Sequence, residues 1–257
     1  MRQTRRTFLG SIAAGSVALI GCIKPEEGVL SATPGGGSSR LSARPSTPSL
    51  SITPGSYLIT ESRTLDGTLV VPSSYSASRP MPLLVGLHGA GGLASGQVTL
   101  LGGLAETYGF LLLAVGARGI TWDVFSSKFS YDVQFIDSAL RWTFQRCNVD
   151  ANRIGIEGFS DGASYTLAMA LTNGDLFSRA IAFSPGFVPD SESPLVGKPR
   201  FFDSHGTQDT VLRIDSASRA IVANLKSAGY TVTYQEFDGG HQVPTTIAAQ
   251  AMGWFME

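Results

Sequence analysis

A serine flanked by glycines interrupts an apolar run in the middle of the chain. Residues 153–159, RIGIEGF, have the composition of a buried strand, and residues 161–171, DGASYTLAMAL, have that of a helix. The G-x-S-x-G stretch between them, GFSDG, is typical of a nucleophile elbow, a sharp turn that exposes a serine at the end of a strand. A side chain at Gly158 or Gly162 would collide with the neighbouring strand or helix. The sequence therefore predicts Ser160 as a nucleophile.

A serine hydroxyl needs a general base, and the chain has three histidines, His88, His205 and His241. In a strand–elbow–helix fold the chain order is serine, acid, histidine, which excludes His88 as the base. His241 lies in the Gly-rich stretch EFDGGHQVP after the last predicted strand, where its side chain is free to point back over the sheet edge. His205 lies just ahead of Asp209, which is the acid favoured below, and we expect it to be a packed histidine that supports the loop of that acid. His241 is the predicted base.

The base in turn needs a carboxylate that orients it. Asp209, in HGTQDTV, follows the penultimate predicted strand and precedes a predicted helix. Asp238 is the rival, three residues before His241, although its place at a strand end favours a turn residue. The sequence favours Asp209 and leaves Asp238 open.

Acyl transfer also needs backbone donors for the oxyanion. The stretch LHGAGG at residues 87–92 is a second Gly-rich turn after a strand, and we expect the N–H groups of Ala90 and Asp161 to meet over the reacting carbonyl. In the stretch RGITWDVFSSKFSYD, Trp122 and Phe125 are candidates for the substrate pocket and are equally compatible with packing.

Strand-like and helix-like segments alternate through the rest of the chain, which predicts an α/β fold with a mostly parallel sheet covered by helices on both faces. Two early segments, YLITES and GTLVVPSS, have no helix between them and predict an antiparallel hairpin at one edge. The later strands are predicted at residues 81–89, 109–117, 153–159, 179–186, 199–206 and 231–239. The helices are predicted at residues 98–108, 131–146, 161–171, 214–227 and 245–255.

The first residues indicate an export signal. TRRTFLG carries the pair Arg5 and Arg6 ahead of a short uncharged apolar run, which resembles a twin-arginine signal. LIGC then ends at Cys22 and resembles the lipobox of bacterial lipoproteins, in which that cysteine carries the lipid. An uncleaved anchor with a chance cysteine is the alternative. The run is too short to span a bilayer comfortably.

Three regions follow from this interpretation: a lipoprotein signal peptide at 1–21, a lipidated cysteine with a flexible Pro/Gly/Ser tether at 22–55, and a catalytic domain at 56–257. The expected location is the extracytoplasmic side of a bacterial membrane. If Cys22 carries lipid, Cys147 has no partner for an intrachain disulfide, and we expect it to pack as a small apolar residue.

The composition suits a single globular domain, with 43% hydrophobic and 15% charged residues. The formal net charge is −1 and no basic patch is present, so nucleic acid is not an expected partner. We expect a monomer.

Residues from about 81 to 257 resemble cap-less α/β-hydrolases of the small esterase branches, similar to poly(3-hydroxybutyrate)-depolymerase-like, feruloyl-esterase-like and phospholipase/carboxylesterase-type enzymes. The resemblance rests on LHGAGG, GFSDG, HGTQD and GGH. It implies hydrolysis of a carboxylic ester, small or polymer-borne, through an acyl-enzyme without metal or organic cofactor. No insertion between Ser160 and Asp209 is long enough for a lid, which favours an open site.

Two other functions are compatible with the same fold. One is a serine peptidase of the related branch, which usually carries an additional domain that restricts access. The other is a binding lipoprotein that has lost the chemistry. The presence of all three candidate triad residues favours catalysis.

Overall fold

Eight strands form one sheet in the order β1-β2-β4-β3-β5-β6-β7-β8. The computed structural model describes residues 38–60, 66–125 and 129–257. β1 and β2 form the antiparallel hairpin at one edge and β2 pairs antiparallel with β4, whereas the remaining pairs are parallel. The strands are β1 Gly55–Thr60, β2 Asp66–Val71, β3 Met81–Leu87, β4 Leu111–Val115, β5 Val149–Phe159, β6 Arg179–Phe183, β7 Arg200–Gly206 and β8 Val232–Phe237.

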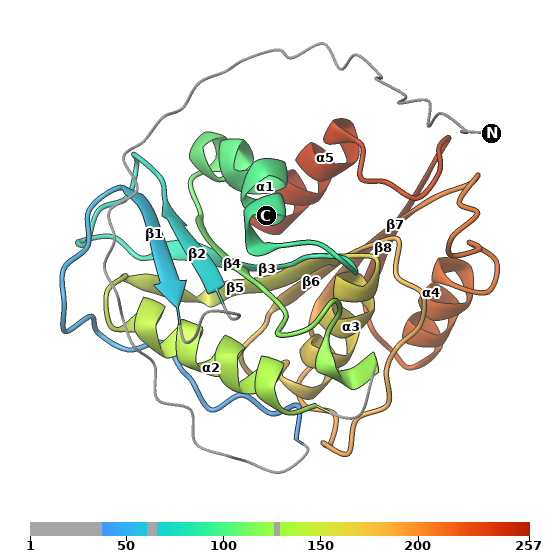
Figure 1. The fold of residues 1–257 in the computed structure, drawn as a ribbon, viewed down its shortest axis with the longest axis horizontal. Coiled ribbons are helices and arrows are strands. Elements are labelled where there is room, and N and C mark those ends of the chain that lie inside the picture. The colour runs from blue at the N-terminus through green and yellow to red at the C-terminus, as the bar shows by residue number, and fades with distance from the viewer. Residues whose placement is uncertain (1–37, 61–65, 126–128) are drawn as a thin grey trace, which may run out of the picture.

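Helices cover both faces of this sheet, as the sequence predicts. α1 and α5 lie on one face, and α2, α3 and α4 lie on the other (Figure 1). Each face has its own apolar core, and β3 and β4 are buried along their whole length between the two. The helices are α1 Ala94–Tyr108, α2 Tyr131–Phe144, α3 Asp161–Thr172, α4 Ser218–Ser227 and α5 Thr245–Met256, with a short 3-10 turn at Asp123–Phe125.

The strand order creates a crevice at the carboxyl end of the sheet. β3 has β4 on one side and β5 on the other, so the chain leaves β3 in one direction and returns on its other side. In open α/β sheets, ligands bind at such a reversal point. The loop after β3 and the turn after β5 therefore meet at one place, and these are the two segments with the predicted oxyanion and nucleophile motifs.

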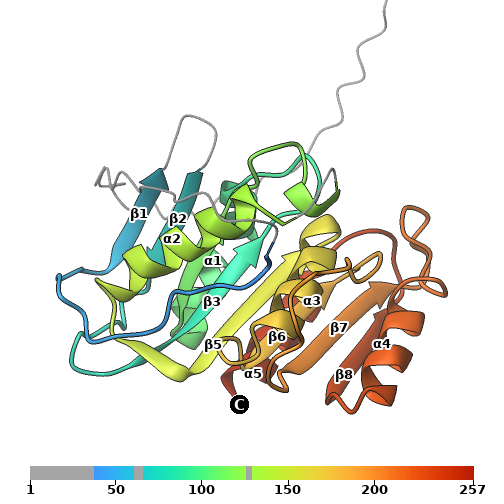
Figure 2. The ribbon, with the colours of Figure 1, turned by 90° about the horizontal axis from the view of Figure 1, so that it is seen from below.

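Residues 38–54, here called the strap, lie against the domain. The strap crosses the face that carries α2 and α3 (Figure 2). Ser39, Leu41 and Ala43 are buried, and Leu41 and Ala43 belong to the core on that face. The prediction of a flexible tether as far as residue 55 is therefore wrong for residues 38–54. Its Ser/Pro-rich average composition concealed these short buried positions.

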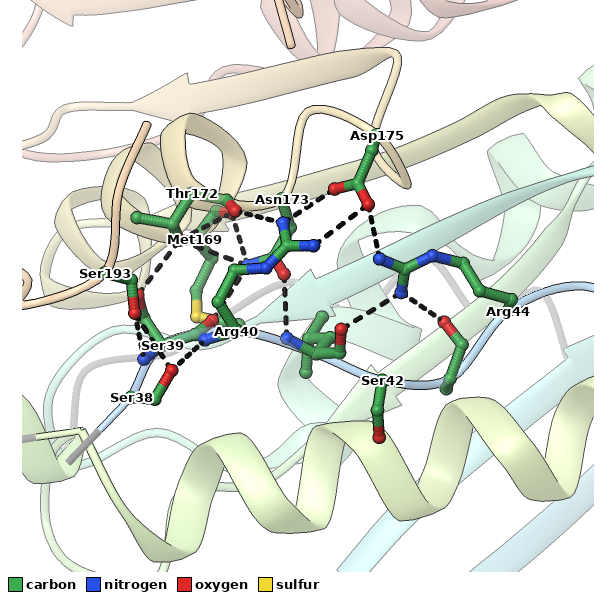
Figure 3. A network of polar contacts seen from close by, with 12 residues as sticks. Ser38, Ser39, Arg40, Ser42, Arg44, Met169, Thr172, Asn173, Asp175 and Ser193 are labelled. Carbon is green, nitrogen blue, oxygen red and sulfur yellow. Dashed lines mark hydrogen bonds and ion pairs between the residues drawn. The ribbon is translucent and has the colours of Figure 1, made fainter. Parts of the chain in front are cut away.

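Polar contacts hold the strap at both helices. The Leu41 N–H donates to Asn173 Oδ1 at 2.8 Å, and the Ala43 N–H donates to Asp137 Oδ1 at 2.6 Å. The guanidinium groups of Arg40 and Arg44 both reach the Asp175 carboxylate (Figure 3). The predicted signal peptide, Cys22 and the first part of the predicted tether lie outside the described residues.

Asp175→Asn is expected to loosen the strap without unfolding the domain. The hydrogen bond from Arg40, with further contributions from Arg44, holds the pKa of Asp175 well below its ordinary value, so the carboxylate is charged at neutral pH. Partly exposed ion pairs contribute at most about 1 kcal/mol each. We expect faster trypsin cleavage after Arg40, and a thermal midpoint lowered by at most a few degrees, about 2–4 °C per kcal/mol.

Asp215→Asn is the matched control, because Asp215 pairs with Arg219 on the outer surface of α4, away from the strap. Cleavage after Arg40 at the parental rate in Asp175→Asn would contradict the assignment.

Candidate active site

Ser160 lies in a sharply bent backbone between β5 and α3. Its φ of 57° and ψ of −119° lie in a region that residues with a side chain rarely adopt. A Cβ on Gly158 would lie 2.4 Å from the carbonyl carbon of Gly162, and a Cβ on Gly162 would lie 2.4 Å from the carbonyl oxygens of Leu87 and His88. Both glycines of the G-x-S-x-G motif are therefore sterically required, as the sequence predicts.

Three of the predicted site residues form a continuous hydrogen-bonded line. His241 Nε2 lies 2.8 Å from Ser160 Oγ, and His241 Nδ1 lies 2.6 Å from Asp209 Oδ2. Because a carboxylate only accepts, Nδ1 carries the proton, and Nε2 accepts from the serine hydroxyl. The other oxygen, Asp209 Oδ1, accepts from the N–H groups of Val211 and Leu212, both at 2.8 Å.

The Asp209 carboxylate is kept ionised by these donors. Burial by itself would raise its pKa, but the hydrogen bonds from the Leu212 N–H, from His241 and from the Val211 N–H lower the pKa below its ordinary value. The rival Asp238 is elsewhere: its Oδ1 accepts from Gln208 Nε2 at 2.5 Å. Asp209, and not Asp238, is the carboxylate hydrogen-bonded to His241.

The acid loop and the histidine loop are joined to each other. The Gln208 N–H donates to the carbonyl of Gly239 at 2.9 Å. A Cβ on Gly206 would lie 2.3 Å from the carbonyl oxygens of Gly239 and Gly240, so only glycine permits this close approach at the end of β7. The imidazole of His241 also packs on the Phe159 ring, with ring centroids 4.8 Å apart.

The other two histidines are packed. His88 Nδ1 donates to the Gly89 carbonyl at 2.7 Å and its Nε2 accepts from the Ala117 N–H at 2.9 Å, while burial lowers its pKa. His205 is fully buried and lies beside Asp209, with Nε2 to Oδ2 at 3.1 Å. The prediction of a packed histidine that supports the acid loop is confirmed in its contacts.

The loop after β3 lies directly over Ser160. A Cβ on Gly89 would lie 3.1 Å from the Ser160 Cβ, so the loop that carries Ala90 passes close to the nucleophile. Asp161 is the first residue of α3, where N–H groups have no acceptor within the helix. Its side chain accepts from Thr121 Oγ1 at 2.6 Å.

Two supports of this loop were not predicted from the sequence. The Leu87 carbonyl accepts from Gln97 Nε2 at 2.7 Å, and the His88 carbonyl accepts from Trp122 Nε1 at 2.9 Å. Each joins residues distant in the sequence, so no local spacing could have indicated it.

Of the two alternatives left open for Trp122, substrate pocket or packing, the structure shows packing. Trp122 is 0% exposed, and its ring packs between those of His88 and Tyr165 at centroid distances of 5.1 and 5.0 Å. Its aromatic size and its place in a predicted loop gave no information about burial. Phe125 is half-buried and packs edge-on against the exposed Phe187, with ring centroids 5.4 Å apart. The segment that carries Phe187 is held at the first turn of α3, where the Gly186 N–H donates to Ser164 Oγ, so Phe125 lies near that turn.

An apolar niche of about 420 Å³ lies between the start of α1 and the histidine loop. Its apolar walls are Leu93, Leu100, Phe159 and Val243, and the His241 ring forms part of its lining. The niche thus adjoins the triad at His241, beside the start of α1.

No group of three or more potential metal ligands is found in the described part of the chain. Cys147 is buried, and burial raises the pKa of its thiol to about 12, which fits packing as predicted and not nucleophilic chemistry. No helix formed by residues 38–60, 66–125 or 129–257 has the length and apolar character needed to cross a membrane.

The family model for phospholipase/carboxylesterase matches residues 123–253, about half of the chain. This chain belongs to the phospholipase/carboxylesterase family. The matched region includes the elbow, the acid loop and the histidine loop, whereas the oxyanion loop after β3 precedes it.

Curated relatives of this family member include acetylxylan esterase A of Emericella nidulans, 33% identical over 117 residues, or 42% of this chain. Feruloyl esterase B of Neurospora crassa is 31% identical over 117 residues, also 42% of this chain. The chain spans only 38% and 40% of the length of these two relatives. A probable feruloyl esterase C of Aspergillus oryzae is 23% identical over 67% of this chain and 74% of its own length.

Solved structures establish the fold of this family member as that of α/β-hydrolase esterases. The esterase PE8 superposes with a TM-score of 0.60 at 20% identity, covering 74% of this chain and 97% of PE8. Acetyl xylan esterase from Aspergillus awamori superposes with a TM-score of 0.56 at 18% identity, covering 75% of this chain and 94% of that enzyme. The predicted fold class is confirmed.

Gly162→Ala is expected to disrupt the elbow, because the new methyl group would overlap the carbonyl oxygens that end β3. We expect the free energy of unfolding to fall by about 1–3 kcal/mol or more, as for other overpacked buried sites. Chemical denaturation measures it. Gly103→Ala is the control, since its Cβ would meet no atom within 4 Å inside α1, and the change should stabilise the protein by about 0.5–1 kcal/mol. Equal stability of the two variants would contradict the steric argument.

Proposed function

We propose that this protein is a serine hydrolase that cleaves carboxylic esters through an acyl-enzyme. The observation that carries the proposal is the hydrogen-bonded line from Ser160 through His241 to Asp209, in a chain of the phospholipase/carboxylesterase family. Relatives named as esterases support the same reaction class. The geometry fits acyl transfer because the hydroxyl, imidazole and carboxylate are each within hydrogen-bond reach of the next.

In the proposed reaction, His241 Nε2 removes the hydroxyl proton as Ser160 Oγ attacks the ester carbonyl carbon. Asp209 holds the imidazole by Nδ1 and stabilises the imidazolium that forms. The N–H groups of Ala90 and Asp161 are proposed to stabilise the oxyanion, since their loops adjoin Ser160. His241 then gives its proton to the leaving alcohol oxygen. A water, deprotonated by His241, hydrolyses the acyl-enzyme and restores Ser160.

The substrate proposed is a small or polymer-borne ester whose alcohol portion is at least partly apolar. The leaving oxygen must lie beside His241 Nε2 to receive its proton. The niche lined by Leu93, Leu100, Phe159 and Val243 adjoins that histidine, so the alcohol portion is assigned to it. The stretch between Ser160 and Asp209 supports an open site. Besides α3, β6 and β7 it holds only short loops, none of them long enough to form a lid.

The sequence supports export as a twin-arginine lipoprotein held by Cys22 on the extracytoplasmic side of a bacterial membrane. Because the strap is fixed to the domain, the tether in this proposal covers residues 22–37 only. We further propose that the domain acts as a monomer.

Ser160→Ala, His241→Ala and Asp209→Asn are each expected to lower kcat on p-nitrophenyl acetate by roughly 10³- to 10⁴-fold or more, because each removes one member of the line. Asp238→Asn is the matched control for the acid and should retain activity, since Asp238 contacts Gln208 instead of His241. Full activity in Asp209→Asn with loss in Asp238→Asn would move the acid to Asp238. Hydrolysis that survives in Ser160→Ala would refute the serine mechanism.

Leu100→Trp is expected to fill the apolar niche. Its kcat/KM for octyl acetate should fall at least about tenfold relative to ethyl acetate, because the longer alcohol needs the occupied volume. Leu58→Trp, on the outer surface of edge strand β1, is the control and should leave the ratio unchanged. If Leu100→Trp instead discriminates among p-nitrophenyl esters by acyl length, the niche holds the acyl group.

A further inference from the structure

Two ionisable side chains of β7 are buried beneath α4, and the proposed reaction uses neither. Asp203 and His205 are two residues apart in the strand and therefore point to the same face. Both are 0% exposed. Ser218, at the first turn of α4, is also fully buried and lies over them. Buried ionisable groups are costly unless their hydrogen bonds are satisfied, so the arrangement of protons among these three residues can be worked out.

His205 is held at both ring nitrogens. Nε2 lies 2.8 Å from the Leu212 carbonyl oxygen and 3.1 Å from Asp209 Oδ2, and Nδ1 lies 2.8 Å from Ser218 Oγ. A carbonyl oxygen only accepts, so Nε2 carries the proton. Burial lowers the pKa of His205 and outweighs the opposing effects of the Leu212 carbonyl and Asp209, so the ring is neutral. Nδ1 therefore accepts from the Ser218 hydroxyl.

Asp203 completes this order of donors. The Ser218 hydroxyl donates its hydrogen bond to His205 Nδ1, so the Ser218 oxygen can still accept one. This hydroxyl lies beside the Asp203 carboxyl. Neither oxygen of Asp203 has a hydrogen-bond partner within the described chain, so this buried carboxyl is unsatisfied as it stands. Burial raises the pKa of Asp203 to about 8, with Ser218 opposing the rise. A protonated Asp203 is the donor that the Ser218 oxygen lacks.

Among the residues that the structure describes, no cation contributes to favouring the ionised form of Asp203. Tyr234 is its neighbour across the β7–β8 pairing, and burial with the nearby acidic groups raises the pKa of that phenol. Further along the same face, Glu236 is ion-paired with Arg219 of α4, which also pairs with Asp215. The positive charge on this face is therefore engaged at the outer surface, away from Asp203.

We propose that Asp203, Ser218 and His205 form a hydrogen-bonded relay that positions the Asp209 carboxylate for His241, with Asp203 acting in its protonated form. In this relay the protonated Asp203 carboxyl donates to Ser218 Oγ, which satisfies a buried group that otherwise has no partner. The remaining contacts, from Ser218 to His205 Nδ1 and from His205 Nε2 to the Leu212 carbonyl and Asp209, are present in the structure. Asp203 and Ser218 are positioning residues, since neither contacts the reacting atoms. The kinetic part of this inference rests on the proposed function.

Ionisation of Asp203 breaks the relay. The proton passes to solvent, and the Ser218 hydroxyl turns toward the new carboxylate. His205 Nδ1 then remains buried without a donor, so the ring is no longer held in the orientation that supports Asp209. His241 loses precise alignment with Ser160 as a consequence, and kcat falls while substrate binding changes little.

The test is the pH profile of kcat and KM on p-nitrophenyl acetate between pH 6 and 10, with the full chain. The parent should lose kcat, at nearly constant KM, with a midpoint near pH 8. Asp203→Asn should remove that limb, because the amide cannot ionise and still donates to Ser218. Asp215→Asn, in the exposed turn just before the same helix, is the control and should keep the limb. An unchanged limb in Asp203→Asn, or a parent that hydrolyses the ester without showing the limb, would overturn the relay.

A second measurement does not require activity. The ¹H NMR resonance of the His241 Nδ1 proton, hydrogen-bonded to Asp209, should shift near pH 8 in the parent and stay constant in Asp203→Asn. If Asp203→Asn fails to fold, Ser218→Ala should also abolish the shift, whereas Ser218→Thr, which keeps the hydroxyl, should restore it. A parent that hydrolyses no ester but shows the shift would refute the proposed function and leave the relay standing. A shift that persists in Ser218→Ala would refute the relay.

Discussion

The strained backbone of Ser160 determines how the site is assembled. Its positive φ requires a turn so tight that α3 begins against the ends of β3 and β5. This contact is possible only because Gly158 and Gly162 bring no side chain between the segments. The same close approach places the loop after β3 beside the nucleophile. The strain is stabilised by the sheet, where the Ser160 N–H donates to the Phe183 carbonyl at 2.9 Å.

Proton positions in the site follow from burial as much as from charge. His88 and His205 are kept neutral, and each holds one loop of the site through its ring nitrogens. Glu157, three residues before Ser160, is fully buried, and burial raises its pKa well above the ordinary value. Asp203, on β7, is also fully buried, and burial raises its pKa in the same way. Asp209 is the exception, because several donors converge on it and keep it ionised.

The strap extends the folded unit beyond the sheet. Leu41 and Ala43 cover the core on the side of α2 and α3, and Asp137, Asn173 and Asp175 satisfy the polar groups around them. The triad lies at the carboxyl end of the sheet, so the strap contributes to stability without entering the site. Its contacts join residues more than 90 positions apart, which explains why composition alone classed it as tether.

The sequence by itself determined the succession of strands and helices along the chain, the elbow at Ser160 and the choice of His241 as base, because apolar period, glycine spacing and chain order are local properties. It favoured Asp209 as the acid, and the structure decided between Asp209 and Asp238. Only the tertiary structure decided that Trp122 is buried, that residues 38–54 are packed, and that Asp203 and Ser218 lie beside His205. These outcomes depend on which segments meet across the sheet and how much water they exclude. Side-chain burial and the pKa shifts that follow from it arise from contacts between distant residues, which no local pattern in the chain specifies.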